Sequence, residues 1–260
     1  MSKPQPLTRR IARGRGHSYL LDGEKTPGVT TILGQGYPKP ALVGWAANLT
    51  AGYAVDRWDE LTELSISERL NRLKGARFDE LREASERGSE VHQLAHRLAA
   101  GEEVDVPESL VGHIDAYDRF VVDWRPQELL VEAVVANRRW RYMGTLDAVA
   151  RLADGRNWLL DFKTSRGIYA DNCLQLCAYS RGEFYVDAAG GEQPLPRIDR
   201  AGIVHLRGDG YDLRPVDISE ETFRVFLYVQ QVARFVDANA DGAGTTHIGE
   251  ALAPPTPEAR

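Results

Sequence analysis

Apolar side chains recur every three to four positions through much of the first half of the chain, which is the spacing of helices that bury one face. The segment Ser65-Ile66-Ser67-Glu68 has the form of a capping box, which opens a helix. Gly75 and Gly101 are stop signals, because glycine favours the position just past a helix end. The pattern therefore predicts helices over 42–53, 66–75, 77–100 and from about 107, the last with Leu110, Ile114, Tyr117 and Phe120 or Val121 on its inner face.

In the second half the pattern changes to short apolar runs and alternating positions, which are typical of strands. Asp22-Gly23 and Asp154-Gly155 are tight-turn pairs, so each one predicts a reversal of the chain. Ser219 precedes two glutamates and caps a last amphipathic helix. The predicted strands span 128–136, 145–152, 158–163, 203–207 and 212–217, and the predicted helices of this half span 171–180 and 219–236.

This order of elements predicts one α/β domain with a helical N-terminal elaboration. The chain divides into a basic arm and hairpin (1–26), a helical N-terminal part (27–125), a core of strands and helices (126–237) and a tail (238–260). The tail is rich in Ala, Gly, Thr and Pro, so it is expected to be disordered.

Composition narrows the class of protein. Hydrophobic residues make up 43% of the 260 positions, which is enough for a sizeable core. Two cysteines cannot build a disulfide scaffold or a four-thiolate metal site within one chain, which favours a reducing compartment. The most apolar stretch, 41–55, is too short and too polar to span a bilayer, and no apolar segment follows the basic N-terminus. We therefore expect a cytoplasmic protein without a membrane partner.

The charge is unevenly distributed. The chain has 32 Lys and Arg against 38 Asp and Glu, for a net charge of -6, which argues against coating of nucleic acid by bulk charge. The first 20 residues nevertheless hold five basic residues and no acidic one. This arm is either a solvated, frayed terminus or a nucleic-acid contact, and the sequence leaves both interpretations open.

Candidate chemistry lies on the strand 158–163 and the strand before it. Alternate residues of a strand share a face, so Asp161 and Lys163 project together while Leu160 and Phe162 point into the core. The preceding strand is expected to pair antiparallel and to bring Asp147 beside Asp161. Two carboxylates, with the Phe162 carbonyl as a further hard oxygen, suit Mg²⁺ or Mn²⁺. An Asp-x-Lys by itself is common, so the joint pattern carries the prediction.

This joint pattern resembles a known family. The sequence carries, in order, Gly88-x-x-x-His92, Asp147, Asp161-x-Lys163 and Gln175-x-x-x-Tyr179. Over about residues 85–182 it is similar to the RecB-like branch of the PD-(D/E)XK nuclease superfamily, as found in exonucleases of phages and mobile elements. The resemblance implies a restriction-endonuclease-like central mixed sheet flanked by helices. It also implies Mg²⁺- or Mn²⁺-dependent hydrolysis of DNA phosphodiesters.

The resemblance assigns a role to each motif residue. It implies that His92, Asp147, Asp161 and the Phe162 carbonyl hold the metal, that Lys163 assists the nucleophilic water, and that Gln175 and Tyr179 order the site. Three of these residues also have ordinary structural interpretations. A lone histidine at the edge of an apolar stripe, such as His92, is often a satisfied core residue, and Tyr179 can be a core tyrosine with a surface Gln175 beside it.

Glu132 lies in the strand before Asp147, where related nucleases often carry an acidic residue near the site. Alternation over 128–136 places it on a face with Leu130 and Val134. A glutamate on such a face needs a partner, and the metal site is one candidate.

Arg138, Arg139 and Arg141 alternate with Trp140 and Tyr142. Basic and aromatic residues together suit phosphate contact with base stacking, and a twisted hairpin with a solvated basic face explains them equally well.

Two features exclude related activities. Iron–sulfur relatives use four cysteines, and Cys173 and Cys177 are the only two here, so no iron–sulfur cluster is expected. The sequence lacks a phosphate-binding loop, so helicase activity needs another subunit. The expected partner is DNA, with a helicase subunit or a single-strand annealing protein as further candidates. The alternatives are a catalytically inactive DNA-binding or assembly module with the same fold, and a nuclease of RNA or of a restricted DNA structure.

Overall fold

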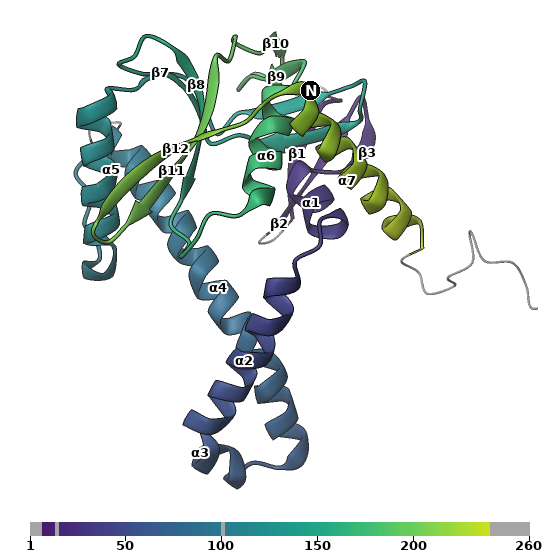
Figure 1. Ribbon diagram of the computed structural model, residues 1–260, viewed down its shortest axis with the longest axis vertical. Helices are drawn as coiled ribbons and strands as arrows, with labels where there is room; N and C mark the ends of the chain where they lie inside the picture. The colour runs from purple at the N-terminus through teal and green to yellow at the C-terminus, as the bar shows by residue number, and fades with distance from the viewer. Residues whose placement is uncertain (1–6, 14–15, 100–101, 240–260) are drawn as a thin grey trace, which may run out of the picture.

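The computed structural model describes residues 7–13, 16–99 and 102–239 (Figure 1). It is a mixed α/β structure with helices on both faces of a five-stranded sheet. In this sheet β8 and β11 run parallel, and the other neighbours are antiparallel. Its strands, from edge to edge, are β12 (Gly210–Val216), β11 (Arg200–Arg207), β8 (Asn157–Lys163), β7 (Ala148–Arg151) and β4 (Gln127–Val131).

The central strand β8 is buried on both faces, which explains its continuous apolar run. Leu159 packs in one core cluster with α1 (Val29–Gly36), α6 (Ala170–Ser180) and α7 (Glu220–Ala238). Leu160 packs in a second cluster, on the opposite face, with residues of α4 (Ile66–Ala99) and α5 (Val111–Trp124). The predicted alternation along this strand is confirmed, and it fixes the face on which Asp161 lies.

The strand predicted over 128–136 is broken in two, and the strand predicted over 145–152 is shorter, over 148–151, and follows a separate strand over 142–145 that was not predicted. β4 ends at Val131, and β5 (Val134–Asn137) joins a different sheet. The other half of the hairpin is interrupted at the same level, between β6 (Tyr142–Thr145) and β7. The hairpin therefore turns a corner from one sheet to the next. The second sheet has the order β10 (Glu192–Pro194), β9 (Phe184–Val186), β5, β6.

The corner is held by backbone hydrogen bonds. The amide of Glu132 donates to the carbonyl of Asp147 at 2.8 Å, and the amide of Leu146 donates to the carbonyl of Ala133 at 3.0 Å. Glu132 has a φ of 49°, in the left-handed region that non-glycine residues adopt rarely. Because the chain direction changes there, Glu132 does not share a strand face with Leu130 and Val134 as alternation predicted.

The N-terminal segment forms a three-stranded sheet. β2 (Gly16–Leu21) and β3 (Glu24–Thr26) form the predicted hairpin, and Asp22 and Gly23 both have positive φ, as a type I′ turn requires. β1 (Arg9–Arg13) pairs antiparallel with β2. Part of the basic arm is thus a strand.

A helical arm extends away from the sheets (Figure 1). It consists of α2 (Pro40–Asp56), α3 (Trp58–Glu63) and the first part of α4. The predicted capping box is present, since the Glu68 amide donates to Ser65 Oγ at 3.3 Å and the Ser65 amide to the Glu68 carboxylate at 3.2 Å. The predicted stop at Gly75 is wrong, because α4 continues through it. An interior glycine costs about 1 kcal/mol, which strong helix formers on both sides offset.

The helix predicted over 42–53 is present as α2, but none of its residues is buried. The other predicted helices are confirmed as α5, preceded by a 3₁₀ turn over Glu108–Leu110, and as α6 and α7. Ser219 caps α7 by accepting from the Thr222 amide at 3.3 Å. None of the helices in the described parts of the chain has the length and apolar content needed to cross a bilayer. Most of the predicted tail, from 240 onward, lies outside the described residues.

Candidate metal centre

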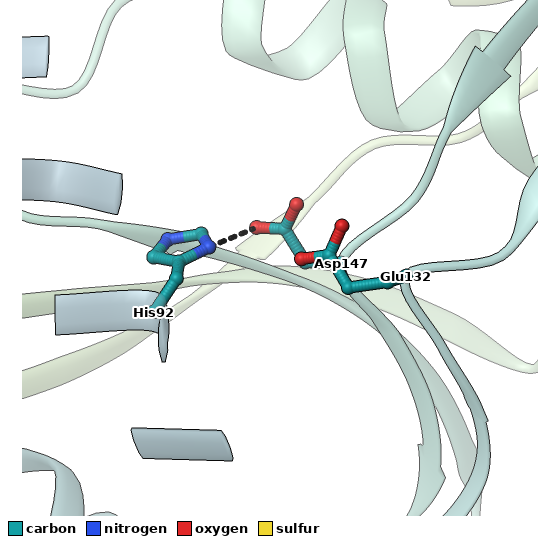
Figure 2. A group of neighbouring side chains, drawn as sticks. All are labelled: His92, Glu132 and Asp147. Atoms are coloured by element: carbon teal, nitrogen blue, oxygen red, sulfur yellow. Dashed lines mark ion pairs between the residues drawn. The ribbon is translucent and has the colours of Figure 1, made fainter. Parts of the chain in front are cut away.

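Three side chains from distant parts of the sequence meet beside the hairpin corner. One ligand atom each of His92, Glu132 and Asp147 lies within 4.8 Å of the other two. His92 comes from α4, and the two carboxylates come from the two arms of the corner. Figure 2 shows the three side chains turned toward one another, with His92 Nδ1 4.0 Å from Asp147 Oδ2.

The contacts of His92 determine which nitrogen faces the carboxylates. Its Nε2 lies 3.0 Å from the carbonyl oxygen of Phe162. In the tautomer that satisfies this contact, Nε2 carries the hydrogen and donates it to the carbonyl. The lone pair of Nδ1 then faces the Asp147 side, toward another electron-rich group. The Nδ1 lone pair and the two carboxylates are electron-pair donors directed at one point, so the donor set fits a divalent metal ion.

Asp147 is held by the strand that faces it. Its Oδ2 accepts a hydrogen bond from the backbone amide of Phe162 at 2.9 Å. Burial raises the pKa of the Asp147 carboxyl, and the nearby Glu132 adds to this effect, although His92 and Lys163 oppose it. A carboxylate that is costly to ionise in a buried position gains most from a metal cation.

Asp161 and Lys163 form an ion pair behind this group. Lys163 Nζ donates to Asp161 Oδ1 at 2.7 Å and lies 2.6 Å from Oδ2. Asp161 is 2% exposed, and burial together with the charge of Asp147 raises its pKa to about 6, with Lys163 opposing. Burial lowers the pKa of Lys163, but the two aspartates outweigh it and the net shift is upward. Lys163 is therefore a cation at neutral pH.

Gln175 and Tyr179 support this ion pair from α6. Gln175 Nε2 donates to Asp161 Oδ1 at 3.3 Å and lies 3.5 Å from the Tyr179 hydroxyl. Tyr179 is buried in the core, and burial raises the pKa of its hydroxyl well above the usual value. Its ring occupies the space beside Gly144, where any Cβ would overlap it. The glycine that precedes Asp147 by three positions is thus required by the tyrosine.

The structure brings together most of the residues that the sequence analysis singled out, with one change in the ligand set. His92 and Asp147 converge, and the Phe162 carbonyl contacts the same imidazole. Both carboxylate oxygens of Asp161 contact Lys163, so this predicted ligand is not part of the converging group. Glu132 takes its place there. Sequence reasoning had placed Glu132 near the site but had no signal for the left-handed backbone that directs it there.

The three arginines occupy the turn between β5 and β6. This turn is at the opposite end of those strands from Glu132, about 20 Å along the chain. Arg138 pairs with Asp22 at 2.8 Å and with Glu192 at 2.5 Å, and Arg141 pairs with Glu24 at 2.5 Å. The guanidinium of Arg139 lies 5.2 Å from the centre of the Trp140 ring. A contact of these arginines with DNA stays a prediction.

A cleft of about 760 Å³ contains the converging group. α4 contributes His92 and Gln93 to its lining, α5 contributes Tyr117 and Phe120, and the corner contributes Glu132, Thr145 and Asp147. Arg10 and His17, from the N-terminal sheet, line the same cleft. The sequence reveals the basic arm, but its position beside the cleft depends on the fold.

Other motif residues have simpler surroundings. A Cβ on Gly88 would lie 3.5 Å from Thr164 Oγ1, which is an ordinary contact, so close approach does not require a glycine there. Cys177 is buried, which raises the pKa of its thiol to about 12, and Cys173 is half-buried with its thiol donating to the Asp217 carbonyl at 3.4 Å.

No family model matches the chain, and no curated protein matches it. A solved structure described as the crystal structure of SSO0001 aligns with 59% of this chain and 70% of its own, with 13% identity and a TM-score of 0.31. A likeness at this level carries no argument about fold or chemistry.

Proposed function

We propose that this chain is a metal-dependent DNA nuclease of the PD-(D/E)XK type, related to the RecB-like branch. The observation that carries the proposal is a cleft in which His92, Glu132 and Asp147 converge beside the buried Asp161–Lys163 ion pair. The central mixed sheet with helices on both faces is consistent with a restriction-endonuclease-like fold. The proposed activity is end-dependent hydrolysis in recombination, repair or phage DNA processing.

The donor set suits Mg²⁺ or Mn²⁺. His92 Nδ1 and the carboxylates of Glu132 and Asp147 would hold the ion. The Phe162 carbonyl, expected from the sequence to be a further ligand, instead accepts from His92 Nε2 and so orients the imidazole. When bound, the ion would polarise the scissile phosphate and lower the pKa of a water molecule. The chain itself supplies the fixed positions: the Phe162 amide orients Asp147, and the corner orients Glu132.

Lys163 supplies a positive charge beside the carboxylates. Because Asp161 and Asp147 keep it protonated, it acts as a donor to the phosphate and stabilises the negative charge that develops there. Asp161 holds the ammonium in place, and Gln175 in turn holds the Asp161 carboxylate. This arrangement favours electrostatic stabilisation over proton abstraction by Lys163.

The test is a cleavage time course with end-labelled linear DNA, circular DNA and RNA, in Mg²⁺, Mn²⁺ or EDTA. The wild-type protein should degrade linear DNA with either ion and leave it intact in EDTA. Lys163→Gln should reduce the rate about 10²–10³-fold, as loss of a charge-stabilising donor does. Lys74→Ala, on the helical arm, is the matched control and should cleave at the wild-type rate.

Circular dichroism is the control that checks whether the Lys163→Gln protein is folded. A folded Lys163→Gln protein that cleaves as fast as wild type would overturn this mechanism. DNA binding without cleavage by the wild-type protein in either ion would favour the inactive module, and cleavage of RNA alone would favour the RNA nuclease.

A further inference from the structure

One face of the N-terminal sheet borders the cleft. Arg10 and His17 line it, and they come from β1 and β2, whose register places Arg10 opposite Tyr19. His17 lies two residues before Tyr19, so all three side chains share a face. The sheet thus adds a wall to the cleft, facing the corner that carries Glu132 and Asp147.

The three side chains form a hydrogen-bonded chain that ends at Thr145. Arg10 Nη2 lies 3.3 Å from His17 Nδ1, His17 Nε2 lies 3.0 Å from the Tyr19 hydroxyl, and that hydroxyl lies 3.0 Å from Thr145 Oγ1. An arginine only donates, so Nδ1 accepts and Nε2 carries the hydrogen. The Tyr19 hydroxyl then accepts from His17 and donates to Thr145.

This direction leaves the Thr145 hydroxyl hydrogen available to a ligand. Thr145 lines the cleft two residues before Asp147. Within 7–13, 16–99 and 102–239, its hydroxyl has no other hydrogen-bond partner. Burial and the charge of Arg10 lower the pKa of His17, which agrees with a neutral imidazole in the chain.

Arg10 differs from the arginines of the β5–β6 turn. Arg138 and Arg141 are paired with carboxylates, whereas Arg10 has no carboxylate partner among the described residues. Its contact with His17 uses one of the five N–H groups of a guanidinium. A cation positioned in this way beside an acidic cleft is suited to an anionic ligand, and a guanidinium matches phosphate oxygens especially well.

We infer that Arg10 and the Thr145 hydroxyl form a phosphate subsite on the cleft wall, and that its ligand is a phosphodiester of the nucleic-acid backbone next to the scissile one. Thr145 is two residues before Asp147, so their Cα atoms lie at most about 7 Å apart. This span covers the axial rise of one to two nucleotides, about 3.4 Å each, so the phosphate next to the scissile one lies within reach. The subsite therefore holds a neighbouring phosphate of the same strand. This inference rests on the proposed function, because it places the scissile phosphate at the converging carboxylates.

The experiment measures DNA affinity as a function of salt in EDTA, so that its readout does not depend on cleavage. A fluorescent oligonucleotide is titrated with wild type, Arg10→Ala, Arg10→Lys and Arg197→Ala. Arg197 is the matched control: it is exposed, pairs with Asp199, and precedes β11 at the end of the sheet opposite Lys163. Loss of one phosphate contact should lower the slope of log K against log salt by about 0.7–0.9.

We expect that smaller slope, with an affinity loss of about tenfold, for Arg10→Ala alone. Arg10→Lys should keep the slope because it keeps the charge. Thr145→Val should weaken binding without changing the slope, since the hydroxyl is neutral. Arg10→Gln is a second neutral variant should Arg10→Ala prove unfolded by circular dichroism.

Two results separate this inference from the proposed function. Wild-type protein that binds DNA, with an unchanged slope in folded Arg10→Ala or Arg10→Gln, would overturn the subsite and leave the nuclease proposal standing. Wild-type protein that binds no DNA would count against both. Inorganic phosphate and a nucleoside monophosphate serve as competitors: Arg10-dependent binding of these alone, without DNA, would assign the subsite to a free phosphate and overturn the backbone assignment.

Discussion

The carboxylate of Asp147 accepts a hydrogen bond from the backbone amide of Phe162, 2.9 Å away, across the boundary between the hairpin corner and β8. The carbonyl of the same Phe162 lies 3.0 Å from His92 Nε2. One residue thus orients two candidate metal ligands through its main chain. Because these contacts use backbone atoms, the positions of Asp147 and His92 are determined by the fold of β8 and not by the identity of a side chain.

Asp147→Asn should remove the stabilisation that a divalent ion gives. At a hundredfold excess over Kd, an ion that binds only the folded state adds about 2.7 kcal/mol to the free energy of unfolding. We expect Mn²⁺ to raise the thermal unfolding temperature of the wild type and EDTA to restore the original value. The unfolding temperature of Asp147→Asn should respond to neither. Asp209→Asn, at an exposed position, is the control and should respond like wild type. An equal Mn²⁺ shift in Asp147→Asn would contradict the ligand assignment.

Two substitutions of Glu132 should separate the effect of its left-handed backbone conformation on stability from the effect of its carboxylate on metal binding. Glycine adopts the left-handed conformation without strain, so Glu132→Gly should stay within about 1 kcal/mol of wild-type stability. Valine is β-branched and should destabilise the fold by about 1–2 kcal/mol. Both variants should bind Mn²⁺ at least tenfold more weakly by calorimetric titration. The idea fails if Glu132→Gly unfolds more readily than Glu132→Val in urea, or if it retains wild-type affinity for the ion.

Gly144→Ala should lower the free energy of unfolding by about 2 kcal/mol or more, because the added methyl group would overlap the ring of buried Tyr179. The cost should fall below about 1 kcal/mol when the same change is made in a Tyr179→Ala background. A double-mutant cycle in urea measures this coupling. Additive effects of the two substitutions would show that the ring and the glycine do not depend on each other.

Arg138→Ala should affect stability and leave DNA binding unchanged, since its guanidinium is paired with Asp22 and Glu192. The pairs are about 40% exposed, so the loss should be about 1 kcal/mol or less. The salt dependence of DNA affinity is the measurement, with Arg10→Ala as the comparison. A smaller salt slope in Arg138→Ala would favour the phosphate contact that the sequence pattern suggested for this turn.

Local signals predicted several elements well. Asp22-Gly23 specifies its turn because both residues tolerate positive φ, and the alternation of β8 places Asp161 and Leu160 on opposite faces. These features depend on neighbours in the sequence, so a sequence pattern can reveal them. The Ser65 cap belongs to the same class.

The rest depends on contacts between distant segments. Glu132 is not a residue type that favours the left-handed region, so its conformation follows from the requirement that one hairpin serve two sheets. The partner of Arg138 is Asp22, 116 positions away, and no local pattern shows that pairing. Likewise α4 continues past Gly75 because the residues along the whole helix stabilise it, and the low helix propensity of one glycine is not enough to end it.

α4 connects the helical arm to the candidate metal centre as one continuous helix. With 34 residues it is a rod of about 50 Å, whose near part carries His92 and whose far part belongs to the helical arm. Glu132 and Asp147 lie on one corner of the sheets, joined by a backbone hydrogen bond. Because His92 lies on this helix and the two carboxylates lie on the corner, the separation of His92 from Asp147 depends on how α4 packs against the sheet.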